Sequence, residues 1–376
     1  MRETRIHFQW SEQTPQARFG TGVSLHSHTL HSHESLDFIY RIAKNCAAVG
    51  WALRRGEARY EYLHGTPLDL RRGWWTPPLA PQDAYSVEFD QISSLGLVPI
   101  VSLTDHDDIE APMSLQVNEA SRNIPVSVEW TVPFMNTFFH LGVHNISPPR
   151  ARATMNRLKA FTERPCASEL QAILAGFHSE PGMLTIFNHP LWDEMGIGPE
   201  QHRTSALAFL SQYGENLHAV ELNGLRPWRE NASVIRMARE LAKPVISGGD
   251  RHALEPNATL NLTNARDFAE FAAEIRDGWS DVLIASHYRT AHATRIFHNI
   301  LDVLRTYENH GLGWTKWSDR VFYTLDDGAT ASLAQLWGDR PPLSVGVFAG
   351  FMHFAGQPRM QYALRAAALG AENVLL

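Results

Sequence analysis

The segment with the clearest chemical potential is residues 24–34, SLHSHTLHSHE, which holds four histidines within eight residues. In an extended strand, side chains two residues apart point to the same face, so His26 and His28 are expected to point together. His33 follows a bend and can return toward the same place, whereas His31 is expected to face away at the surface. Imidazole nitrogens combined with carboxylates suit Zn, Fe, Mn or Ni. The segment therefore predicts part of a metal site rather than a histidine-rich surface turn.

The other groups such a site needs follow short apolar runs later in the chain. They are Asp105, His106, Glu129, His140, His189, Asp250 and His252. Taken singly, each has an ordinary structural explanation, such as a hydrogen-bonded core histidine or a helix cap. Taken together, that many buried polar groups would be costly without a shared partner.

The elements that carry these residues alternate between strand and helix patterns. Strands are expected at 22–27, 97–103, 124–130, 138–146, 183–187, 218–222 and 244–247. Helices are expected at 35–54, 81–95, 111–122, 231–242, 287–307 and 360–369, with two more between 149 and 179. This rhythm predicts a parallel sheet covered by helices, and about seven or eight strands suggest a closed or nearly closed barrel. In such barrels the chemistry lies at the carboxyl ends of the strands.

The chain divides into a core and less readable additions. Residues 1–21 are expected to be a loosely packed lead-in, and residues 22–286 the barrel domain. Residues 55–82, rich in tryptophan, arginine and proline, are expected to be an insertion near the mouth of the site. Residues 287–376 form a C-terminal extension that either completes the barrel or makes a small appendage.

Composition excludes several classes of protein. The 376-residue chain has a formal net charge of -7, which argues weakly against a broad nucleic-acid-binding surface. Its two cysteines, Cys46 and Cys166, are far apart and give no disulfide framework. We find neither the apolar run of a signal peptide nor a stretch near the roughly 20 residues of a membrane span. A soluble cytoplasmic protein without a membrane partner is expected; its oligomeric state is left open.

The polar motifs also occur in a familiar order. They are HSH at 26–28 with Ser32 and His33, LTDHD at 103–107, Glu129 followed by FHLG at 139–142, NHP at 188–190, and GDRH at 249–252. This series resembles the PHP (polymerase and histidinol phosphatase) superfamily of metal-dependent phosphoesterases. The likeness extends over residues 22–252, about two thirds of the chain. One departure is His33, since the family commonly has an acidic residue at that place.

The resemblance implies a distorted (β/α)7 barrel with two or three divalent metal ions, of Zn, Mn or Fe. It implies one metal on His26, His28, Glu129 and Asp250, a second on Glu129, His140 and His189, and a third on His33, His106 and His252. It places Asp105 behind these ligands, where it would orient an imidazole. Glu129, Asp250 and His252 are expected to be catalytic, with Glu129 bridging two metals. His33 leaves the identity and occupancy of the third metal open.

The activity implied is hydrolysis of a phosphate ester on a small phosphorylated substrate by a metal-activated hydroxide. Arg226, Arg251 and His144 are candidates for contacting the substrate, although a solvent-facing arginine would fit the pattern equally well. Three alternatives stay open. The first is the same metal site acting on a carbon–nitrogen bond or, as a nuclease-type phosphodiesterase, on nucleic acid, although long nucleic acid is not favoured. The second is a non-catalytic metal-binding protein, and the third is a barrel whose histidines are structural. The substrate, and the choice between monoester and diester, cannot be read from the sequence.

Overall fold

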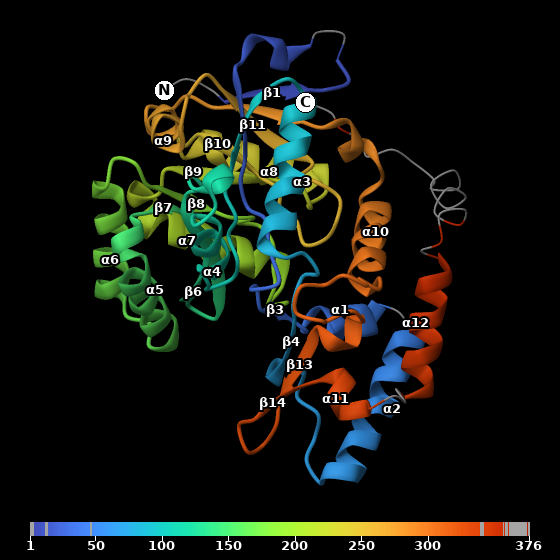
Figure 1. The fold of residues 1–376 in the computed structure, drawn as a ribbon. Coiled ribbons are helices and arrows are strands. Elements are labelled where there is room, and N and C mark those ends of the chain that lie inside the picture. Colours follow the sequence, from blue (N-terminus) through green and yellow to red (C-terminus); the bar gives the residue numbers. More distant parts are fainter. Residues whose placement is uncertain are drawn as a thin grey trace.

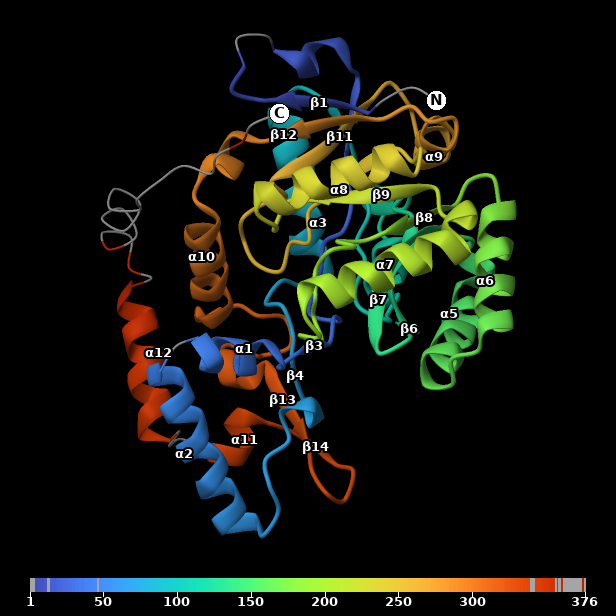
Figure 2. The same cartoon turned by 180° about the vertical axis from the view of Figure 1, so that it is seen from behind.

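A computed structural model describes residues 4–11, 14–45, 47–338 and 342–355, together with residues 357, 360 and 374. It has a larger lobe of sheets and helices, and a smaller lobe beneath it that contains both early and late parts of the chain (Figures 1 and 2). Cys46 and almost all of the helix expected at 360–369 lie outside the described residues.

The first large sheet has the strand order β1-β12-β11-β2-β5. Its strands are β1 (Arg5–Phe8), β12 (Asp281–Ile284), β11 (Thr259–Thr263), β2 (Thr21–Ser24) and β5 (Val98–Val101). The segment expected to be a loose lead-in therefore contains an edge strand, since β1 pairs in parallel with β12. Its short, mixed composition gives no clear strand pattern, and only the pairing with β12 defines it.

The second large sheet has the order β10-β9-β8-β7-β6. Its strands are β10 (Val245–Gly248), β9 (Ala219–Asn223), β8 (Leu184–Phe187), β7 (Thr137–Ile146) and β6 (Val126–Phe134). The turn between β6 and β7 is too short for a crossover, so these two strands must be antiparallel.

The two sheets meet at two seams, each made by an isolated bridge. One joins His106 to Glu129 and the other joins Ser27 to Arg251. Within the described residues, the hydrogen-bonded pairs of the two large sheets are four parallel and four antiparallel. The expected all-parallel sheet is thus wrong in part, and the architecture is a mixed α/β fold of two sheets.

Helices cover the outer faces of the sheets. They are α3 (Pro81–Ser94), α4 (Glu110–Leu115), α5 (Pro148–Glu163), α6 (Ala167–Ser179), α7 (Pro199–Tyr213), α8 (Trp228–Glu240), α9 (Phe268–Arg276) and α10 (His292–Leu304). Short 3-10 turns lie at Pro15–Arg18, Leu70–Arg72, Glu119–Ser121, Gly214–Asn216, Ser286–Arg289 and Trp317–Asp319. Helix α5 begins at a proline, which needs no hydrogen-bond acceptor there, and buries Met155, Leu158 and Phe161 at helical spacing. These side chains pack with the fully buried Trp130 of β6.

The smaller lobe joins segments that are far apart in the sequence. Its sheet has the order β14-β13-β4-β3, from the strands β14 (Thr330–Ser332), β13 (Val321–Thr324), β4 (Gly73–Trp75) and β3 (Glu34–Ser35). Its helices are α1 (Phe38–Asn45), α2 (Ala47–His64), α11 (Leu333–Trp337) and α12 (Leu343–Ala355). The expected insertion is partly helical, and β4 within it pairs with β13 of the C-terminal extension.

None of the helices in the described part of the chain has both the length and the hydropathy that crossing a membrane requires.

Candidate metal centre

Three residues proposed as ligands lie where strands of the large sheets end, and each has a left-handed backbone. The φ angles are 65° at His26, 22° at His189 and 57° at Asp250. Such conformations cost roughly 1–3 kcal/mol for a residue with a side chain, and they persist only where the surrounding structure enforces them. Each sharp bend turns a side chain from the strand direction toward the centre of the site.

Glu129 on β6 is the hub of the centre and is fully buried. Its Oε2 lies 2.9 Å from Nε2 of His26 and 3.3 Å from Nε2 of His28. Its Oε1 lies 3.1 Å from Nε2 of His189 and 3.6 Å from Nδ1 of His140. One carboxylate thus faces two separate groups of histidines, which is the arrangement a bridging ligand needs.

Three of these ligand atoms are arranged to coordinate one cation rather than to form hydrogen bonds with one another. His26 Nε2, His28 Nε2 and Glu129 Oε2 are all buried, and none has a hydrogen-bond partner. These three atoms lie within 4.8 Å of one another. Buried polar atoms without partners are costly in a folded protein, and a shared cation would satisfy all three at once.

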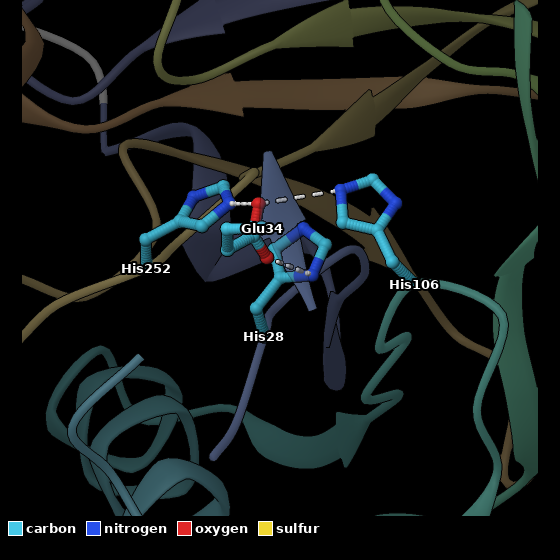
Figure 3. Close-up of side chains that lie close together, drawn as sticks. All are labelled: His28, Glu34, His106 and His252. Carbon is cyan, nitrogen blue, oxygen red and sulfur yellow. Dashed lines mark ion pairs between the residues drawn. The ribbon is translucent and has the colours of Figure 1, made fainter. Parts of the chain in front are cut away.

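A second group surrounds Glu34 on β3 (Figure 3). Glu34 Oε2 lies 3.1 Å from Nε2 of His252 and 3.4 Å from Nε2 of His106. Its Oε1 lies 3.6 Å from Nδ1 of His28 and accepts a hydrogen bond from the Ser32 hydroxyl at 2.6 Å. Together with His28, His106 and His252, Glu34 forms a further potential metal site beside the one around Glu129.

The structure places Glu34, not His33, in this group. His33 is exposed, and its ring stacks on Trp74 at a centroid distance of 5.0 Å. The chain bends before β3, so that the side chain of Glu34, and not that of His33, points toward His106 and His252. The acidic residue that the motif lacks at position 33 is therefore supplied by the next position.

Asp250, at the end of β10, faces the same space from the opposite seam. Its Oδ1 lies 3.4 Å from Nε2 of His28 and 3.6 Å from Nε2 of His26. Its Oδ2 accepts hydrogen bonds from Asn223 and from Arg226, the latter at 3.1 Å. Overlapping groups thus bring together eight of the residues proposed from the sequence, namely His26, His28, His106, Glu129, His140, His189, Asp250 and His252.

Local charges and burial keep Glu129 and His28 in the forms that metal binding needs. Burial works against ionisation of Glu129, but the neighbouring histidines, His26 first, hold its pKa well below the usual value. Burial and the adjacent His252 lower the pKa of His28 to about 4, so this imidazole is neutral near pH 7. Metals bind ionised carboxylates and neutral imidazoles, so both shifts favour binding.

Glu221 on β9 is a partner of the ligands that the sequence analysis missed. His26 Nδ1 donates to its Oε1 at 2.5 Å, and the backbone N–H of His189 donates to its Oε2 at 2.7 Å. A side chain at Gly248 would collide with this carboxylate, at 1.7 Å from Oε1. Glu221 therefore sets the orientation of one imidazole and the position of a second ligand.

Replacing this carboxylate by its amide tests that role. For Glu221→Gln we expect metal affinity to fall by about 10- to 100-fold, because His26 loses the acceptor that orients its ring. Titration against a chelator of known affinity measures the change. Glu215→Gln is the matched control, since Glu215 is exposed near the end of α7. Unchanged affinity in Glu221→Gln would show that the carboxylate does not orient the ligand.

Two residues expected at the centre instead hold the surrounding loops. Asp105 accepts hydrogen bonds from the backbone N–H of Thr29 at 2.5 Å and from its hydroxyl at 2.7 Å, and burial raises its pKa to about 7. It bonds to a loop, and no hydrogen bond to an imidazole is seen among the described residues. Arg251 points away from the centre, and its Nε donates to the buried Glu88 at 2.6 Å. That pairing makes Arg251 a structural residue rather than a substrate contact.

His144 lies inside the fold, and within the described part of the chain its ring forms a hydrogen bond with Ser102 and not with a potential ligand. Its Nδ1 lies 2.8 Å from the Ser102 hydroxyl, which itself donates to Ser127. Burial lowers the pKa of His144 to about 3, so the ring is neutral in the folded protein. A fully buried imidazole of this kind does not contact a substrate.

This pKa predicts a specific loss of stability in acid. The unfolded chain takes up a proton at His144 near pH 6.5, while the folded chain does not until about pH 3. The contribution of His144 to the free energy of unfolding is therefore fully present above pH 6.5. Below that pH it decreases by about 1.4 kcal/mol per pH unit. In urea unfolding of the metal-free proteins between pH 7.5 and 5, the free energy of unfolding should depend less steeply on pH in His144→Gln than in the unmodified protein. Equal slopes for the two proteins would contradict this assignment.

An open cavity of about 320 Å³ adjoins the centre. Its lining includes two potential ligands, His106 and His140, together with Phe138, Lys159 and Glu194. Glu194, which the sequence analysis did not single out, lies 3.9 Å from Nδ1 of His140. The cavity gives a small molecule access to the potential metal ligands.

Arg226 lies beside the centre, as the sequence analysis expected. Its guanidinium stacks 3.8 Å above the ring of Trp192, and its Nε is buried without a hydrogen-bond partner. The indole and Asp250 hold the guanidinium in place beside the potential metal ligands.

Comparisons with known proteins give distant likenesses. No family model matches the chain, and no curated protein matches it. An amidohydrolase from Chromobacterium violaceum, solved with sulfate and without metal, is 14% identical with a TM-score of 0.34, over 47% of this chain and 84% of that one. PsfC from Pseudomonas syringae is 13% identical with a TM-score of 0.39, over 74% of this chain and 98% of that one. A candidate metal-dependent phosphoesterase from Bifidobacterium adolescentis is 14% identical with a TM-score of 0.34, over 53% and 92%. At these values the likenesses are remote, and the function proposed below rests on the site itself.

Proposed function

We propose that this protein is a metal-dependent hydrolase and that its substrate is a small phosphate ester. The observation that carries the proposal is the set of three buried donor atoms without hydrogen-bond partners, on His26, His28 and Glu129. Further histidine groups share these residues, so the donor set fits two or three divalent ions of Zn, Mn or Fe rather than one. The absence of cysteine from these groups favours hard or borderline cations.

The groups around the cavity fit hydrolysis of an ester with an anionic centre. Bound divalent cations would supply Lewis acidity and a water of lowered pKa. In the reaction, a water oxygen bonds to phosphorus, the P–O bond to the alcohol breaks, and the alcohol oxygen takes a proton. Arg226, whose guanidinium is held beside Asp250, would pair with a phosphoryl oxygen of the substrate. Glu129, Asp250 and His252 are the proposed catalytic residues, and they would hold the cations beside the phosphoryl group.

The same reasoning extends to the fold. We propose that the two sheets are an opened form of the distorted (β/α)7 barrel expected from the PHP resemblance. The bridges His106–Glu129 and Ser27–Arg251 support this, because they join the sheets at both seams. Residues at or next to both bridges are proposed ligands, so the metals would bind where the two sheets meet.

Elemental analysis of the purified protein, followed by turnover of aryl phosphate mono- and diesters, tests the function. We expect two to three equivalents of metal, and turnover that is lost in chelator and restored by the metal. Protein that binds no metal would overturn the proposal. Metal without turnover of either ester would instead favour a non-catalytic metal-binding protein or a hydrolase of another bond.

A further inference from the structure

The sheet of the smaller lobe carries a proposed metal ligand. Glu34 lies on β3, a strand of only two residues at the edge of the order β14-β13-β4-β3. Its backbone pairs with Trp75 of β4, and Ser35 pairs with Trp74. The side chain of Glu34 reaches the histidines of the centre, so the register of β3 on β4 decides where this carboxylate lies.

Strands β3 and β4 are too short to hold that register alone. They have two and three residues, and an isolated two-stranded ribbon is at best marginally stable in water. The opposite edge of β4 is paired by β13, with Val321 against Trp75 and Phe322 against Trp74. The C-terminal extension therefore supplies the strands that make a stable sheet around β4. Figures 1 and 2 both show β13 and β4 side by side beneath the larger lobe.

Aromatic side chains reinforce this pairing and lead toward the centre. Phe322 stacks on Trp74 at 5.7 Å between ring centroids, and Trp74 stacks in turn on His33, the residue before Glu34. On the same strand, Trp75 lies 5.9 Å from the ring of His252. Ring contacts thus lead from Phe322 of the C-terminal extension to His33, next to Glu34, and the neighbouring Trp75 contacts His252.

The strand β13 is itself firmly anchored by a buried arginine. Arg320 precedes it and is 1% exposed. Its guanidinium donates to the carbonyl oxygens of Trp314 at 2.8 Å and Val303 at 2.7 Å, while its own carbonyl accepts from the Thr76 N–H at 2.9 Å. The strand β13 is therefore fixed both to the end of α10, within the extension, and to the segment after β4.

We propose that the C-terminal extension is a positioning element of the metal centre, which places Glu34 through the β13–β4–β3 ladder and so controls one metal site selectively. The controlled site is the group of His28, Glu34, His106 and His252. The groups around Glu129 are held by the large sheets and do not depend on the extension. This inference rests on the metal centre proposed above.

Metal stoichiometry in Phe322 variants tests the inference. Metal-free protein is titrated with Mn²⁺, and bound metal is counted after gel filtration. We expect Phe322→Ala to bind one equivalent fewer than the unmodified protein, as should Glu34→Gln, which alters the ligand itself. Phe322→Tyr, which keeps the ring, should restore the full number. Thr330→Ala, at an exposed position on β14 of the same sheet, is the control and should bind the full number.

The outcomes separate this inference from the proposed function. Unmodified protein that binds no Mn²⁺ would overturn the metal centre, and this inference with it. If Phe322→Ala keeps every equivalent, the centre stands and the positioning role is overturned. Loss of all metal would also overturn the selective role, because the extension would then support the whole fold. Phe322→Leu, which retains an apolar side chain, repeats the test if the alanine variant does not fold by circular dichroism.

Discussion

Glu129→Gln is expected to remove metal and hydrolytic activity together. The carboxylate is fully buried, and its two oxygens face different histidines, so one substitution affects two groups of ligands. Gln has nearly the same shape but lacks the charge that draws a cation. Losing a partner behind a ligand costs about 10- to 100-fold in metal affinity or activity, and losing a shared ligand should exceed that range. Metal content and turnover of aryl phosphates measure both effects.

The control for this change is Glu163→Gln, at the exposed end of α5. It removes the same charge at a distance from the centre and should leave metal content and turnover unchanged. A Glu129→Gln protein that keeps its full metal content would sink the bridging role. One that keeps metal but loses turnover would show that Glu129 acts on the reaction without holding the cations.

Regular strands explain how much of the centre could be predicted. His26 and His28 follow β2, so the end of an apolar strand predicts their place at the centre, although the left-handed backbone at His26 and not strand alternation sets its direction. Asp250 and His189 follow apolar runs whose ends lie near one another in any sheet of this kind. These features depend on local periodicity, which a single sequence displays. The alternation of strands and helices was predictable for the same reason, whereas the antiparallel pairs within the sheets were not.

The remaining features depend on geometry that no local pattern encodes. Glu34 takes the place expected for His33 because the chain bends irregularly before β3. In such a bend, the spacing of residues in the sequence does not show which way a side chain points. Glu221 reads as an ordinary residue inside β9, and only the folded sheet brings it to His26. The pairing of Gly73 in β4 with Tyr323 in β13 joins distant segments, each too short to show a clear strand pattern.

Gly249→Ala is expected to destabilise the fold by about 3 kcal/mol or more. A Cβ at Gly249 would lie 1.7 Å from both Cγ and Oδ1 of Asn257, so one of the two segments must move. The Asn257 amide donates to the Ser24 hydroxyl at 2.6 Å and to the Leu25 carbonyl oxygen at 3.1 Å. Moving Asn257 would leave buried groups unpaired beside His26. Urea unfolding measures the loss, and metal content should fall with it.

The control is Gly176→Ala in α6, where nothing lies within 4 Å of the added Cβ. There alanine should stabilise the helix, by up to about 1 kcal/mol. Asn257→Ala tests the cause, because it removes both atoms, Cγ and Oδ1, that the new methyl group would meet. If the collision is responsible, the double variant will be less destabilised than the sum of the two single variants. Simple additivity would mean that the cost of Gly249→Ala arises elsewhere in the loop that carries Asp250.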